Sequence, residues 1–110
     1  MTAPVAGYYQ VSTTLETESA AARIASALVE ERLAACVHVI GPVRSTYRWK
    51  GVVEQATEWL CLAKTAEPRL PALLGRIRAL HPYQQPEIVA TPIVAGDQGY
   101  LDWLQRETVE

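Results

Sequence analysis

The residues most capable of chemistry in this sequence gather in one short run of its last third. The run His81-Pro82-Tyr83-Gln84-Gln85-Pro86-Glu87 holds a histidine, a tyrosine and a carboxylate beside two prolines. Each proline fixes a φ angle and removes a backbone donor, so the connection is stiff, and stiff loops often carry function. His81 offers a neutral ring nitrogen and Glu87 the nearest carboxylate, so the run predicts a metal site with these two side chains as ligands. The alternative is that His81 ends a helix and interacts with its last carbonyls.

The cysteines supply further candidate metal ligands. Cys36 follows two alanines at the start of a predicted strand, and its thiolate would suit Cu⁺. His38 lies on the same face two residues later, either as a second ligand or as a solvent-facing edge residue. The alternative for Cys36, and more so for Cys61 within an apolar run, is packing as a small hydrophobic side chain. Neither belongs to a C-x-x-C pair, so we expect reduced thiols. The predicted metal ligands are therefore His81, Cys36 and Glu87.

A second set combines aromatic rings with one basic group, and with Glu87 it can line a cleft for a small anionic or aromatic ligand. Its members are Tyr47, Trp49, Lys64, Tyr83 and Trp103. Alternatively, Tyr47 and Trp49 anchor an oligomer interface, while Lys64 and Glu87 form a structural ion pair. Dinucleotide, P-loop and zinc-protease motifs are absent from the sequence, and we expect a protein without catalytic activity.

Composition narrows the class of protein. The 110 residues predict a single domain over 1–110, and the hydrophobic fraction of 49% is too high for a disordered chain. A net charge of -2 argues against nucleic acid as a partner. No apolar run reaches the ~20 residues that span a bilayer. Residues 1–7 lack the basic segment and apolar core of a signal peptide, so we expect a frayed terminus and a cytoplasmic protein.

The period of the apolar residues predicts the elements that position these side chains. Strands are expected over 8–14, 36–49, 52–65 and 87–94, and helices over 18–32, from Glu67 to Leu80 and after Gly96-Asp97. Gly41-Pro42 interrupts the second strand as a bulge would, and Lys50-Gly51 marks the tip of one long hairpin. The order β-α-β-β-α-β plus a terminal helix predicts an α+β, ferredoxin-like sandwich with both helices on one sheet face.

Two features predict an oligomer. In the strand around residue 60, Trp59 and Cys61 point to one face and Leu60 and Leu62 to the other, so both faces are apolar although helices cover one. Each hairpin arm is ~14 residues or ~45 Å long, against ~5–6 residues for a typical strand. We expect another subunit to cover the overhanging ribbon. The alternative is that the ribbon bends at Gly41-Pro42 and folds back on its own domain.

With the elements assigned, five motifs follow one another between about Val11 and Leu104. They are Glu31-Arg32-Leu33-Ala34-Ala35-Cys36-Val37, Tyr47-Arg48-Trp49-Lys50-Gly51, Lys64-Thr65, His81-Pro82-Tyr83-x-x-Pro86-Glu87-Ile88 and Tyr100-Leu101-Asp102-Trp103. In these motifs and in their collinear order, the sequence resembles the CutA family of divalent-cation tolerance proteins.

The resemblance implies a homotrimer of ferredoxin-like subunits, similar to the PII signalling proteins, that binds copper or another divalent cation in metal tolerance. No established reaction comes with it. Thr13 stands where some members carry a cysteine and Leu80 where some carry a second histidine, so weak metal binding is expected. The alternative function is a PII-like sensor or adaptor that holds a small molecule between subunits. The resemblance names no partner protein.

Overall fold

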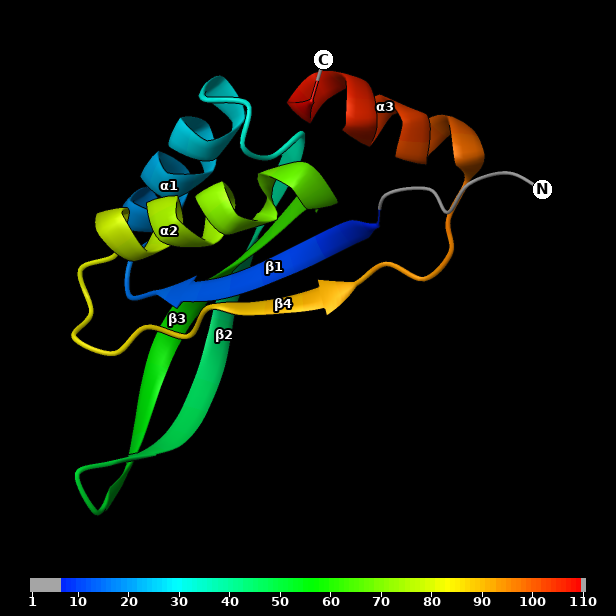
Figure 1. The fold of residues 1–110 in the computed structure, drawn as a ribbon. Helices are drawn as coiled ribbons and strands as arrows, with labels where there is room; N and C mark the ends of the chain where they lie inside the picture. Colours follow the sequence, from blue (N-terminus) through cyan, green and yellow to red (C-terminus); the bar gives the residue numbers. More distant parts are fainter. Residues whose placement is uncertain (1–6, 110) are drawn as a thin grey trace.

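The structure, a computed structural model, describes residues 7–109 and has the predicted order of elements (Figure 1). Residues 1–6, most of the expected frayed terminus, lie outside the described residues. The elements are β1 (Tyr8–Leu15), α1 (Glu18–Glu30), β2 (Cys36–Trp49), β3 (Val52–Ala66), the 3₁₀ turn η1 (Glu67–Arg69), α2 (Leu70–Leu80), β4 (Val89–Pro92) and α3 (Gln98–Thr108). This is the α+β, ferredoxin-like arrangement that the sequence predicts.

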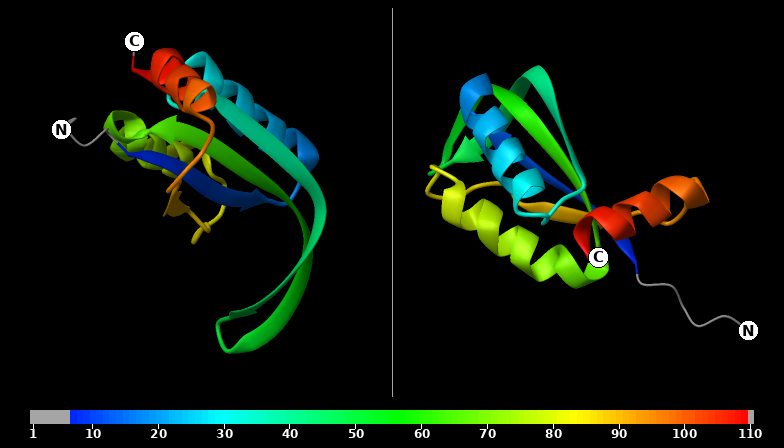
Figure 2. Two further views of the ribbon diagram at one scale, coloured as in Figure 1. Left: turned by 90° about the vertical axis from the view of Figure 1, so that its right-hand side faces the viewer. Right: turned by 90° about the horizontal axis from the view of Figure 1, so that it is seen from above.

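The four strands form one antiparallel sheet in the order β2-β3-β1-β4, and α1 and α2 pack side by side on it (Figures 1 and 2). The core lies between this helix pair and the sheet, where alternate strand residues meet the apolar stripes of the helices. Its fully buried members include Val11, Leu15, Cys61, Leu28, Leu73 and Ile77. Thr17 caps α1, because its hydroxyl accepts a hydrogen bond from the N–H of Ala20 at 3.1 Å.

Helix α3 covers one end of the opposite sheet face. Tyr8 and Ala66 are each three residues from a strand residue of the main core, so they point to the other face, and there they pack against Leu104 of α3. Arg32 holds the end of α3 by donating to the carbonyls of Arg106 at 2.7 Å and Glu107 at 3.0 Å. Arg69 donates to the carbonyl of Thr108 at 2.7 Å. These side chains satisfy carbonyls that a helix end leaves without partners.

Two element boundaries differ from the prediction. Helix α1 ends at Glu30 rather than at residue 32, because Arg32 adopts a left-handed backbone with φ of 60°. Strand β4 has four residues rather than the eight of 87–94, since it pairs only with Tyr9–Ser12 of β1. Pro86 before it and Pro92 at its end cannot donate backbone hydrogen bonds to a neighbouring strand.

Strands β2 and β3 form a ribbon that leaves the sheet. They pair from Cys36 and Lys64 to Trp49 and Val52, with a shift of register between Ile40 and Val43, where Gly41-Pro42 was expected to form a bulge. At the tip, Lys50 and Gly51 have φ of 49° and 83°, typical of a type I′ hairpin turn.

The outer part of the ribbon, residues 43–58, extends beyond the four-stranded sheet. Strand β1 pairs with β3 only from Trp59 onward, so no strand lies beside the outer part (Figure 2). The chain measures 53 × 26 × 22 Å, and its radius of gyration of 15.0 Å exceeds the ~13 Å of a compact chain of this length. The ribbon does not fold back on its own helices, so the alternative expectation is wrong.

Candidate functional site

A cleft of about 910 Å³ separates the ribbon from the loop that joins α2 to β4. Residues 45–49 and three alternate residues of β3 form the ribbon side, and residues 83–87 form the loop side. Thr14 and Glu16, at the end of β1, close the space between the two sides. The stiff loop and the ribbon tip, which the sequence singled out separately, therefore face one common space.

Four of the residues predicted for a ligand cleft do line it, namely Tyr47, Trp49, Tyr83 and Glu87. Lys64 lies elsewhere, on the sheet face opposite α1 and α2 (the open sheet face), because its neighbour Ala63 points into the core. The predicted ion pair of Lys64 with Glu87 is not formed within the described chain. Trp103 also lies elsewhere, because α3 packs it beside Tyr100 with ring centroids 5.6 Å apart. Of the predicted set, the cleft of one chain therefore contains Tyr47, Trp49, Tyr83 and Glu87 but neither Lys64 nor Trp103.

The cleft is more acidic than the expected set, which had one basic and one acidic group. Four carboxylates line it, those of Glu16, Glu54, Glu58 and Glu87, against one guanidinium, that of Arg48. Because Lys64 is outside the cleft, the field inside one chain attracts cations, and the lining does not favour an anionic ligand.

A buried hydrogen bond ties the loop to the ribbon across the inner end of the cleft. The Tyr83 hydroxyl donates to Oε2 of Glu58 at 2.8 Å, and Glu58 is only 7% exposed. Burial is the main cause, and the Glu58 carboxylate the second, of a raised pKa of the Tyr83 hydroxyl. The hydroxyl therefore keeps its proton and remains the donor. The contact joins residues 25 apart in the sequence and fixes the width of the cleft at this end.

His81 lies behind the cleft, at the end of α2, and both of its ring nitrogens are engaged. Nδ1 accepts from the backbone N–H of Tyr83 at 3.2 Å, so the proton is on Nε2, which donates to the carbonyl of Thr14 at 2.8 Å. The histidine ends the helix, as in the alternative interpretation, and its backbone N–H donates to the carbonyl of Ile77, but its side chain binds the end of β1. A metal ion can bind this ring only if one of these hydrogen bonds breaks.

We predict that His81 makes the stability of the fold depend on pH. Burial lowers the pKa of His81 below its ordinary value of 6.5, so as the pH falls through 6.5 the unfolded chain takes up more protons than the folded chain. The free energy of unfolding should therefore fall as the pH drops through 6.5 and stop falling below the pKa of the folded state. Urea denaturation between pH 5 and 8 measures this, and a His81→Asn variant serves as control. The prediction fails if both proteins show the same pH dependence in this window.

The predicted metal ligands do not converge within one chain. The hydroxyl of Ser12 donates to Glu87 at 3.2 Å in the cleft, whereas Cys36 pairs with Lys64 at the other end of the sheet. Within residues 7–109, no group of three His, Cys, Asp or Glu side chains is placed to hold a metal ion. Metal binding by His81, Cys36 and Glu87 therefore stays a prediction, and the side chains that complete such a site must come from elsewhere.

The two cysteines have different surroundings. Cys61 is buried in the core, its thiol donates to the carbonyl of Ala21 at 3.7 Å, and burial raises its pKa to about 11, so packing is its observed role. Cys36 is half-buried on the open sheet face. Its Sγ lies 3.6 Å from Nε2 of His38, and Nδ1 of the same ring lies 3.4 Å from Nζ of Lys64.

Three of the four cleft carboxylates, Glu16, Glu54 and Glu58, were not predicted from the sequence. Glu54 and Glu58 lie four residues apart on β3 and therefore share a face, and Glu54 pairs with Tyr47 across the ribbon. Pairing the arms from the tip at Gly51 would have found Glu54. The register shift at Gly41-Pro42 hides the position of Glu58, and Glu16 gives no signal in the sequence.

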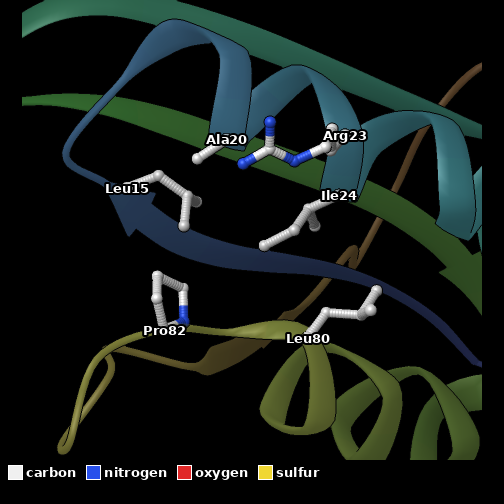
Figure 3. Close-up of a pocket in the computed structure, with 6 residues that line it drawn as sticks. All are labelled: Leu15, Ala20, Arg23, Ile24, Leu80 and Pro82. Carbon is white, nitrogen blue, oxygen red and sulfur yellow. The ribbon is translucent and has the colours of Figure 1, made fainter.

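A smaller pocket of about 180 Å³ lies between α1 and the end of α2 (Figure 3). Leu15, Ile24, Leu80 and Pro82 supply apolar walls, and Arg23 is the one charged residue among those that line it. Apart from Arg23, the residues that line this pocket offer only apolar contact.

The sequence matches the family described as CutA1 divalent ion tolerance protein over residues 9–107. The chain belongs to this family. The divalent-cation tolerance protein CutA of Thermus thermophilus is 52% identical over 95 residues, which are 86% of this chain and 92% of that protein. Protein CutA of Homo sapiens is 42% identical, and the chain spans only 53% of its length. The family resemblance drawn from the five motifs is thereby confirmed.

Solved structures of the family share the fold. The divalent cation tolerance protein Cut A1 of Thermus thermophilus superposes with a TM-score of 0.88 at 50% identity, covering 92% of this chain and 98% of that one. A structure from Archaeoglobus fulgidus, described as a periplasmic divalent cation tolerance protein, gives 0.88 at 34% identity with the same coverage. In this chain, none of the helices within residues 7–109 combines the length and apolar character needed to cross a membrane.

Proposed function

We propose that this protein acts in divalent-cation tolerance by binding copper, or another divalent ion, weakly at the acidic cleft. The observation that carries the proposal is the set of four carboxylates facing one guanidinium in that space. Carboxylate oxygens bind divalent cations, and their summed field raises the local concentration of cations. Glu87 is the candidate ligand that sequence and cleft have in common. The protein carries out no reaction in this proposal.

We further propose that the functional unit is a homotrimer. The outer ribbon is a two-stranded sheet, which alone is marginal in water, and its tip exposes Val52 at 60% and Val53 at 58%. The open sheet face also exposes Ile40 and Val89. A ring of three subunits lets each ribbon lie on the next subunit and brings a second chain to each cleft. Further metal ligands would then come from the neighbour, since one chain holds too few.

Calorimetric titration of the tag-free protein with Cu²⁺ and with Zn²⁺ tests the cleft. We expect Glu87→Gln to weaken Cu²⁺ binding, because it removes one of the cleft charges without changing shape. The matched control is Glu30→Gln, an exposed carboxylate of α1 outside the cleft. A parallel titration of His81→Ala decides whether His81 is a metal ligand. If its isotherm matches that of the wild type, His81 does not bind the metal. Equal binding by wild type and Glu87→Gln would refute the proposal for the cleft.

The cleft also favours a second function, sensing of a small organic cation. Tyr47, Trp49 and Tyr83 present rings next to the carboxylates, and aromatic faces attract cations. A PII-like sensor or adaptor would hold such a molecule between subunits and signal to a partner protein. A thermal-shift screen of amines, neutral metabolites and metals separates the two functions, because only the sensor should be stabilised by an amine. In either case we propose a cytoplasmic location and no role for nucleic acid or membrane.

A further inference from the structure

The small pocket between α1 and the end of α2 combines an apolar lining with one charged residue (Figure 3). Leu15 and Ile24 belong to the main core, whereas Leu80, at 36%, and Pro82 remain exposed. A hydrocarbon group in the pocket would remove this apolar surface from water, which is favourable. The lining therefore favours a hydrocarbon group, and the one charge decides what that group must be attached to.

The charged residue is Arg23 of α1, whose guanidinium points back toward Ala20 along the α1 side of the pocket (Figure 3). Among residues 7–109 the salt bridge joins Arg76 to Glu31, and Arg23 has neither an ion pair nor a hydrogen bond. Its N–H donors are therefore free to bind an anion. A carboxylate matches a guanidinium best, because two parallel N–H···O bonds fit its planar shape.

We propose that this pocket binds a short aliphatic carboxylate, with its hydrocarbon chain against the apolar lining and its carboxylate on Arg23. The nearby N–H groups of Ala20 and Ala21 already donate to Thr17, so they supply no second anchor for the anion. The pocket holds about 180 Å³, which is below the ~300–1,000 Å³ of sites for drug-sized ligands. Only a short chain can therefore be enclosed.

The pocket and the acidic cleft lie on either side of the end of β1. Leu15 lines the pocket and its neighbour Thr14 lines the cleft, because successive strand residues point to opposite faces of the sheet. Pro82 and Tyr83 divide between the two sites in the same way at the start of the loop. The carboxylates of the cleft repel an anion, so the two sites select opposite charges. Since no metal takes part in the pocket, this proposal and the one for the cleft can fail separately.

Titration of the assembled, metal-free protein with hexanoate, followed by nuclear magnetic resonance of the backbone amides, tests the site. We expect the signals of Ala20, Arg23 and Leu80 to shift, and those of Tyr47 and Trp49 in the cleft to stay in place. Hexanol has the same chain without the charge and should bind about fivefold more weakly, which is the upper range for an exposed ion pair. Each methylene added between propanoate and hexanoate should strengthen binding by up to about fourfold.

Two pairs of variants separate the charge from the apolar lining. Arg23→Gln removes the charge and should weaken hexanoate binding about fivefold. Arg106→Gln is its matched control, because Arg106 is an exposed arginine of α3 that does not line the pocket. Leu80→Ser should also weaken binding, because it removes an apolar wall. Its control is Val29→Ser, since Val29 is 41% exposed on α1 and lies outside the pocket.

The proposal is overturned if the pocket signals do not move in the assembled protein, because another subunit then covers the pocket or the pocket stays empty. It is also overturned if hexanol binds as tightly as hexanoate, or if Arg23→Gln and Arg106→Gln bind hexanoate equally well, because Arg23 then holds no anion. The amide spectrum of each variant shows whether the fold is retained. Both arginines are exposed, so their comparison decides the matter even if Leu80→Ser fails to fold.

Discussion

Replacing Trp49 with alanine is expected to lower the melting temperature steeply and to release smaller species at low protein concentration. Trp49 lies at the end of β2, pairs with Val52 across the tip and is 37% exposed in the single chain. If the next subunit covers the ribbon, burial of this side chain contributes about 2–3 kcal/mol. A closed ring makes the same contact three times, so one substitution acts on all three interfaces.

Light scattering coupled to size exclusion, over a dilution series, measures this effect together with a thermal melt. Val94→Ala is the matched control, because Val94 is 93% exposed and lies outside the ribbon. Its loss should leave both the mass and the melting temperature near those of the wild type. A wild-type protein that runs as a stable, folded species of 12.1 kDa at micromolar concentration would contradict the trimer and the shared cleft with it.

The second large effect is expected at Gly41, where the ribbon leaves the sheet. A methyl group at this position would collide with the indole of Trp59, with Cδ1 nearest and Cγ only 2.7 Å away. Trp59 packs against the main core, so it cannot move aside without disturbing its neighbours. We expect Gly41→Ala to cost about 1–3 kcal/mol, as overpacking does, and to change the direction in which the ribbon points.

Urea denaturation of Gly41→Ala measures the cost, and light scattering shows whether the redirected ribbon still supports assembly. Gly75→Ala is the matched control, because a methyl group there meets nothing within 4 Å and the residue lies within α2. Alanine is the better helix former, so this control should be neutral or more stable by up to about 1 kcal/mol. Equal losses in both variants would show that the contact with Trp59 does not constrain Gly41.

The order of elements was predictable because each rests on local signals. The apolar period of α1 and α2, the cap at Thr17 and the turn at Gly51 are properties of short segments. The boundaries that were wrong depend on distant residues. Arg32 ends α1 in a left-handed conformation while its side chain holds the end of α3, more than 70 residues later. Strand β4 is short because β1, rather than its own sequence, sets the length of the pairing.

The candidate site was predictable only in part, since its two sides come from segments that the sequence keeps apart. The stiff loop with Tyr83 and Glu87 was predictable from its prolines. Lys64 was assigned to the cleft on residue type alone, and register with Cys36 places it on the open face instead. Similarly, Glu58 lines the cleft and bonds to Tyr83, which lies 25 residues later in the sequence. Pairing between distant segments decides which side chains reach the cleft, and a single sequence does not reveal that pairing.

The ribbon also sets the order of events when this chain folds. Its two arms are joined by a two-residue turn, so they can pair within microseconds, long before β1 meets β3 from some 50 residues away. In a trimer, the outer ribbon finds its cover only by collision with another chain, and that last step is second order. Protein concentration would then govern how long the bare ribbon and its unpaired edges persist, and with them the exposure to aggregation.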